Sequence, residues 1–137
     1  MKRSVFPVSV VALSFGLGGI AQACVVPSDW LAMTGAAGKP VNAAIALNRE
    51  KIVVGEPFSV NLAVCSAGAA PIDRVTIDAM MPRHRHGMNY KPRMTDFGGG
   101  RYRVKPFVFH MPGLWRVVVT TYRKDQSIQL QRDFQVQ

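Results

Sequence analysis

The sequence predicts an all-β domain, an immunoglobulin-like antiparallel β-sandwich of about seven strands, and three observations support this prediction. After residue 42, apolar residues alternate with polar ones along most of the chain, which is the pattern of strands with one buried face. Turn segments that contain Gly or Pro separate these stretches at short intervals. No stretch has the sustained period of an amphipathic helix. With 137 residues, the chain has room for one such domain.

The first 23 residues have the composition of a signal peptide. The basic start Met1-Lys2-Arg3 precedes an uncharged apolar stretch, and Ala21-Gln22-Ala23 places small residues where signal peptidase requires them. A membrane anchor is the alternative, but it requires about 20 consecutive apolar residues, and glycines interrupt the run before that length. We therefore expect cleavage after Ala23, and a periplasmic or secreted protein with no transmembrane segment after cleavage.

The expected mature chain contains two cysteines, Cys24 and Cys65. Exported proteins usually pair their cysteines because their compartment is oxidising, and we therefore expect a Cys24–Cys65 disulfide. The alternative is a lipoprotein with Cys24 acylated and Cys65 free. Lipoprotein signals usually carry Leu three residues before the cleavage site, where this chain has Ala21.

The first half of the domain begins with an irregular leader. Residues 24–41 contain two prolines and two glycines and show no sustained period. The main domain, residues 42–137, then begins with a strand predicted over residues 45–54. A second strand, Phe58 to Val64, alternates strictly. Cys65 has the opposite parity in this strand, so its side chain should point outward, toward the leader.

Five further strand segments are predicted along the rest of the chain. In order, they span residues 75–79, 101–104, 107–109, 114–122 and 128–136. The segment from Leu114 to Tyr122 is rich in Val, Thr and aromatic residues, as a central strand should be. Pro112-Gly113 before it is a strong turn signal. Residues 80–100 break the alternation and form the longest irregular stretch, with Gly98-Gly99-Gly100 expected in a hairpin turn.

Soft metal ligands are concentrated between residues 80 and 111. This window holds all three histidines and five of the seven methionines of the chain: His84, His86, His110, Met80, Met81, Met88, Met94 and Met111. Imidazoles and thioethers together suit Cu(I), and outside the cytoplasm they are more durable soft ligands than free thiols. The sequence therefore predicts a Cu(I) site.

The predicted site combines two segments, and a structural interpretation of the same residues stands beside it. The expected ligands are His86, Met88, His110 and Met111, with His84 and Met94 in reserve. Methionine is also a common gap-filler in protein cores, and Met80 and Met81 at the end of a strand are typical of that use. The histidines of the turn would then only hydrogen-bond to backbone.

The chain is basic, with 17 Lys and Arg against 8 Asp and Glu and a formal net charge of +9. Between residues 83 and 105, one acid, Asp96, faces seven basic residues: Arg83, Arg85, Lys91, Arg93, Arg101, Arg103 and Lys105. These charges disfavour a divalent cation and suit an anionic ligand or an acidic docking partner. They are dispersed and without aromatic interleaving, so we expect no nucleic-acid partner. No catalytic motif is present in the sequence, and we expect no enzymatic activity.

Two elements of the sequence resemble the YtkA-like family. They are Met81-Pro82-Arg83-His84-Arg85-His86-Gly87-Met88 and, later in the chain, His110-Met111-Pro112-Gly113-Leu114-Trp115. The resemblance runs from about residue 46 to residue 136, and the chain is more distantly similar to the FixH proteins. It implies an exported, immunoglobulin-like β domain. FixH proteins are associated with copper supply to a terminal oxidase, and they carry a membrane anchor that the expected mature chain lacks.

Carried over by position, the resemblance implies that the site residues are His84, His86, Met88, His110 and Met111. Two functions follow from these observations. The first is a periplasmic protein that holds Cu(I) at a shallow loop site and passes it to a copper-accepting protein. The second is an interaction module without metal that docks on an acidic partner through its basic MPxHxHGM loop. The first function requires that the 84–88 turn and the 110–111 strand end meet at one end of the domain.

Overall fold

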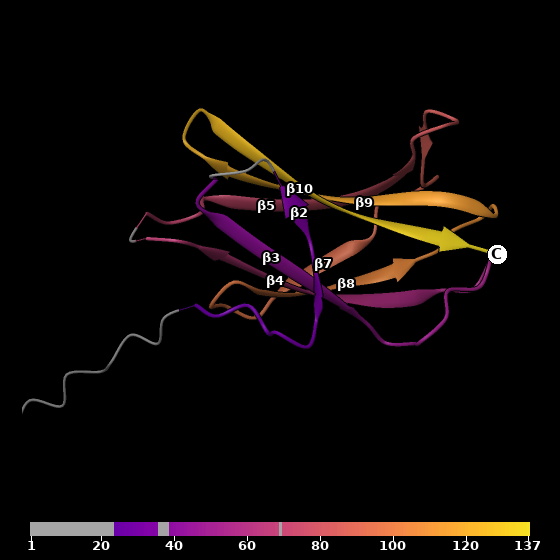
Figure 1. Ribbon diagram of the computed structural model, residues 1–137, viewed down its shortest axis with the longest axis horizontal. Coiled ribbons are helices and arrows are strands. Elements are labelled where there is room, and N and C mark those ends of the chain that lie inside the picture. The colour runs from indigo at the N-terminus through magenta and orange to yellow at the C-terminus, as the bar shows by residue number, and fades with distance from the viewer. Residues whose placement is uncertain (1–23, 36–38, 69) are drawn as a thin grey trace, which may run out of the picture.

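The computed structural model describes residues 24–35, 39–68 and 70–137, and the predicted signal peptide lies outside the described residues. Ten strands form two antiparallel five-stranded sheets that pack face to face as a sandwich (Figure 1). This part of the chain contains no helix. In particular, it has no helix of the length and apolarity needed to cross a bilayer. The predicted all-β sandwich is confirmed.

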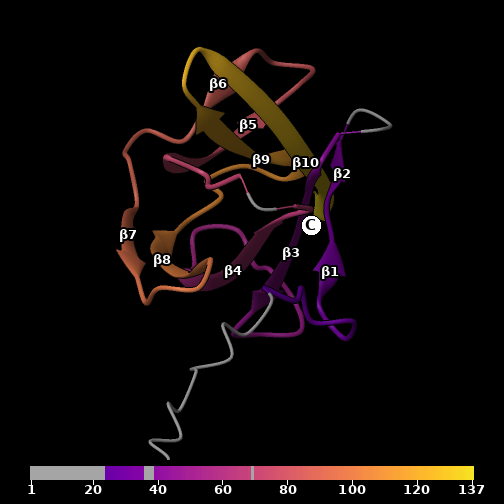
Figure 2. The same ribbon diagram turned by 90° about the vertical axis from the view of Figure 1, so that its left-hand side faces the viewer.

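The two sheets are named A and B here. Sheet A has the strand order β1-β3-β4-β8-β7, with β1 (Leu31–Ala32), β3 (Val41–Leu47), β4 (Phe58–Ser66), β7 (Arg93–Asp96) and β8 (Arg101–Phe107). Sheet B has the order β2-β10-β9-β5-β6, with β2 (Thr34–Gly35), β5 (Arg74–Met81), β6 (His86–Gly87), β9 (Gly113–Arg123) and β10 (Gln126–Val136). In the side view, β7 and β8 lie beside each other at one edge of sheet A, with sheet B above them (Figure 2).

The core lies between the sheets, and the alternation of the sequence decides which residues enter it. In β4, the predicted inward set of Phe58, Val60, Leu62 and Val64 is at most 3% exposed. These side chains meet Val117 and Val119 from β9 in one hydrophobic cluster. Each fully buried aliphatic side chain stabilises the fold by roughly 1.5–3 kcal/mol. The period-two pattern of the sequence therefore identifies the β4 residues whose burial stabilises this core.

The observed strands differ from the predicted ones in several places. The first strand, expected to reach residue 54, ends at Leu47. The Asn48 N–H still donates to the Ser59 carbonyl at 3.2 Å, but the Ser59 N–H donates to the side-chain oxygen of Asn48, 2.7 Å away, and the pairing stops there. The segments 101–104 and 107–109 were expected as separate strands, yet β8 runs through Pro106. This proline lies in a β-bulge, where no ladder hydrogen bond is required of it. Finally, β6 and β7 lie inside the stretch 80–100 that was expected to be irregular.

The leader, residues 24–41, was expected to be irregular but contains two short strands. β1 pairs with β3 in sheet A, and β2 pairs with β10 in sheet B, so the leader connects the edges of both sheets (Figure 2). The Cys24–Cys65 disulfide is present, with 5.5 Å between the two Cα atoms. As its parity predicts, Cys65 faces away from the core, toward the leader. Arg101 also holds the leader, because its guanidinium donates to the Val25 carbonyl at 2.6 Å.

Two glycines of the β7–β8 hairpin allow a matched stability test. Gly98 and Gly100 both have left-handed backbones, with φ of +79° and +74°. A Cβ on Gly98 would meet nothing within 4 Å, whereas a Cβ on Gly100 would overlap the Val64 carbonyl oxygen. We expect Gly98→Ala to lower the free energy of unfolding by about 1 kcal/mol, and Gly100→Ala by about 2–4 kcal/mol. Urea unfolding followed by circular dichroism measures both, and equal losses would contradict this account of Gly100.

Candidate metal centre

The first part of the candidate site is a tight hairpin at the edge of sheet B. β5 ends at Met81, residues 82–85 form the turn, and β6 begins at His86, which pairs directly with Met81. The Arg85 N–H donates to the Met81 carbonyl at 2.9 Å, and Arg85 itself has a left-handed φ of 54°. Because directly opposed residues of an antiparallel pair share one face of the sheet, the side chains of Met81 and His86 lie on the same side.

The second part is the connection from β8 to β9. Phe109, His110, Met111 and Pro112 cross from sheet A to sheet B, where β9 begins at Gly113. The Trp115 indole N–H donates to the Met111 carbonyl at 3.0 Å. The Trp115 ring is fully buried and stacks on Phe109, with 4.5 Å between ring centroids and an interplanar angle of 8°. Trp115 therefore fixes the backbone of the 110–111 segment from within the core.

The hairpin and this connection meet at one end of the sandwich. The ring centroids of His86 and His110 are 5.4 Å apart, and those of His84 and His86 are 5.9 Å apart. His86 and His110 both contact the Trp115 ring at steep angles, with centroid separations of 6.2 Å and 5.3 Å. The geometric condition stated for the copper hypothesis is thus fulfilled: two segments distant in sequence bring their imidazoles together.

Two methionine sulfurs, those of Met81 and Met111, lie near His86. Met81 is 1% exposed, whereas Met111 is 36% exposed. Gly113 makes room for the buried thioether, because a Cβ at this position would come within 2.9 Å of the Met81 methyl carbon. In the described ranges, no group of three or more His, Cys, Asp or Glu side chains is arranged to hold a metal ion. The donors around His86 are thus its own imidazole and two thioethers, with the His110 ring beside them.

The remaining predicted ligands take different positions. His84 is exposed and borders a cavity of about 280 Å³ that Met81 also lines. Met88 is partly buried and packs against the hydrophobic core, as does Met94 from β7 in the other sheet. The sequence argument assigned Met81 to packing, and its burial agrees, but its sulfur also lies near His86. The alternation of the sequence gives no signal for this position, because it follows from the register of the hairpin across its four-residue turn.

The basic charges are less concentrated around the histidines than the sequence suggested. Of the seven basic residues between 83 and 105, Arg83 and Arg85 lie in the hairpin turn with His84, and both are exposed. Four others lie on β7 and β8 of sheet A: Arg93, Arg101, Arg103 and Lys105. After the hairpin, burial raises the pKa of the Tyr90 hydroxyl.

Comparison with known proteins identifies the family to which the chain belongs. The sequence profile of the YtkA-like family matches residues 35–120, more than half of the chain. The match begins and ends earlier than the resemblance at residues 46–136, and it includes both the hairpin and the 110–115 segment. Searches of curated proteins and of solved structures give no significant match. The profile match and the sandwich agree with each other, and the chain belongs to the YtkA-like family.

Proposed function

We propose that this domain is an exported binding protein, not an enzyme, that holds Cu(I) beside His86 and passes it to a copper-accepting partner by ligand exchange. The observation that carries the proposal is the position of the His86 imidazole near the sulfurs of Met81 and Met111. Imidazole and thioether ligands suit Cu(I), whereas hard cations require oxygen ligands. The Cys24–Cys65 disulfide supports an oxidising compartment outside the cytoplasm, and within that setting we propose the periplasm.

The two sulfurs would have different roles. Met81 is buried and its methyl group occupies the space that Gly113 leaves, so its thioether would form the inner, fixed side of the site. Met111 is more than a third exposed and would form the outer side, where an incoming ligand can replace it. His110, whose ring lies beside that of His86, would be the next imidazole available to the metal.

The hairpin charges support a monovalent metal over a divalent one. Arg83 and Arg85 flank the exposed His84 in the turn. Coulomb repulsion is proportional to the charge of the bound ion, so Cu(II) or Zn(II) would experience twice the repulsion that Cu(I) experiences at the same distance. The same charges would favour an acidic acceptor protein approaching this end.

The proposal predicts a specific loss of Cu(I) affinity. In an anaerobic titration against a chromophoric Cu(I) chelator, we expect His86→Ala and Met111→Ala each to weaken binding about tenfold, and the double variant about a hundredfold. Each substitution removes one soft donor, and both residues are on the surface side of the core. The domain of residues 24–137 is the sample.

Two conservative variants serve as controls. Met94→Leu removes a thioether from β7 in the other sheet and should leave Cu(I) affinity unchanged. Met88→Leu distinguishes packing from ligation, because Met88 packs against the core, and we expect no loss of affinity. If the unaltered domain binds Cu(I) no more tightly than the His86→Ala, Met111→Ala double variant, the proposed function is wrong.

A further inference from the structure

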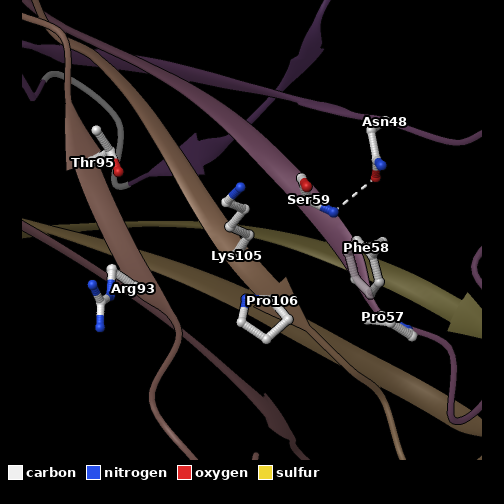
Figure 3. Close-up of a pocket in the computed structure, with 8 residues that line it drawn as sticks. All are labelled: Asn48, Pro57, Phe58, Ser59, Arg93, Thr95, Lys105 and Pro106. Atoms are coloured by element: carbon white, nitrogen blue, oxygen red, sulfur yellow. Dashed lines mark hydrogen bonds between the residues drawn. The ribbon is translucent and has the colours of Figure 1, made fainter.

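A hollow of about 510 Å³ lies on the outer face of sheet A, and none of the residues that line it is a histidine (Figure 3). β7 contributes Arg93 and Thr95, β8 contributes Lys105 and Pro106, and Asn48 and Ser59 lie on the far side. Arg93, Thr95 and Lys105 are all exposed. The hollow therefore combines two cations with neutral side chains that can form hydrogen bonds, and Pro57, Phe58 and Pro106 add an apolar part to its lining.

The two cations are in an arrangement that the fold alone does not favour. Arg93 and Lys105 are directly opposite each other in the β7–β8 pair, and like charges in that position destabilise a sheet. Arg103 precedes Lys105 by two residues and is on the same face, about 6.6 Å away along the strand. Its guanidinium donates to the side-chain oxygen of Asn61 at 3.0 Å, which holds it over this face.

No carboxylate neutralises this group in the described residues. The two ion pairs found there are Arg49–Glu56 and Arg116–Asp133. Asp96 is on β7 but has the opposite parity to Arg93, and it pairs with Tyr102 instead. Burial, and after it the negative charge of Asp96, raise the pKa of the Tyr102 hydroxyl. The nearest acid on β7 thus faces away from the three cations.

We propose that this hollow is the docking site for an extended, acidic segment of a partner protein. One carboxylate of the segment lies between Arg93 and Lys105, and a second carboxylate two residues away meets Arg103. The spacing supports this occupant, because alternate residues of an extended chain are also about 6.6 Å apart. Thr95 and the side-chain amide of Asn48 are positioned at the hollow to bond to the backbone of the segment. The proposal does not depend on metal binding.

An anionic membrane fits the same surface less well. A lipid surface is contacted by protruding basic and apolar side chains, whereas Arg93 and Lys105 border a recess that polar side chains such as Thr95 and Asn48 also line. Phe97 is a large exposed apolar side chain four residues after Arg93, and the Arg103 guanidinium lies 5.7 Å from its ring centroid. The recess and its regular charge spacing favour a protein segment.

The test uses the metal-free domain and a fluorescent peptide in which Asp and Ser alternate over six residues. Fluorescence anisotropy should show binding that weakens as salt rises, because the charges are exposed and are screened within a Debye length of about 8 Å at physiological salt. We expect the double variant Arg93→Glu, Lys105→Glu to weaken binding tenfold or more. This variant keeps two like charges opposite each other, so its fold should be retained, which thermal unfolding checks.

A charge-matched control separates location from net charge. Lys39→Glu with Lys124→Glu makes the same change of charge at two exposed residues that do not line the hollow, and it should keep most of the affinity for the peptide. Equal losses in the two double variants would overturn the proposal, as would binding to phosphatidylglycerol vesicles without binding to the peptide. Because no metal is present, a failure of the copper experiments leaves this result unaffected.

Discussion

Removing the Cys24–Cys65 disulfide is expected to lower the free energy of unfolding by about 4 kcal/mol. The bond connects residues 41 positions apart, and the chain-entropy estimate for a loop of this length is about 4 kcal/mol, because the bond restricts the unfolded chain. The loss is a large part of the roughly 5–15 kcal/mol by which most domains are stable. Urea unfolding of the Cys24→Ala, Cys65→Ala variant, followed by circular dichroism, measures it.

Chemical reduction of the unaltered domain provides the control for this prediction. The reduced domain and the double alanine variant should unfold at nearly the same urea concentration, since both lack the same constraint. The sandwich should still form, because the core of β4, β8 and β9 lies on the other side of sheet A from the bond. A loss below about 1 kcal/mol would mean that the constraint on the unfolded chain contributes little.

Trp115→Ala is expected to lower the free energy of unfolding by about 3–5 kcal/mol. Trp115 is fully buried, stacks on Phe109, and contacts the rings of both His86 and His110. Truncation leaves a large cavity at the junction of the two sheets and removes the hydrogen bond to the Met111 carbonyl. Circular dichroism is the suitable probe, because this substitution removes a fluorophore.

The matched variant is Trp115→Phe. It keeps an aromatic ring against Phe109 but cannot donate to Met111, so we expect a smaller loss of about 1–2 kcal/mol. Two-dimensional NMR of the histidine rings adds a second measurement, because loss of the hydrogen bond should alter the environment of His110 in both variants. If Trp115→Ala and Trp115→Phe were equally stable, packing at this position would not contribute as described.

The amino-acid sequence by itself determined the class of the fold and much of its core. Strict alternation in β4 identified which side chains are buried, and the opposite parity of Cys65 placed it toward the leader. Gly98-Gly99-Gly100 predicted the hairpin correctly, since all three residues have positive φ. These features depend on neighbours along the chain, or on the face of a strand that a residue occupies. The alternation of apolar and polar residues indicates that face directly, because successive side chains point to opposite faces of a strand.

The tertiary structure decided which of the clustered ligands meet. The sequence placed His86, Met88, His110 and Met111 in one predicted site, but it could not show that Met81 lies opposite His86, because that depends on the register of a hairpin. Nor could it show that Arg93 and Lys105 are opposed on the face of sheet A, since residues 80–100 carried no strand signal. Register between strands is set by turn geometry and by packing of the buried face. Local periodicity gives no information on turn geometry or on this packing. The candidate site and the basic hollow could therefore be identified only from the pairing of the strands in the structure.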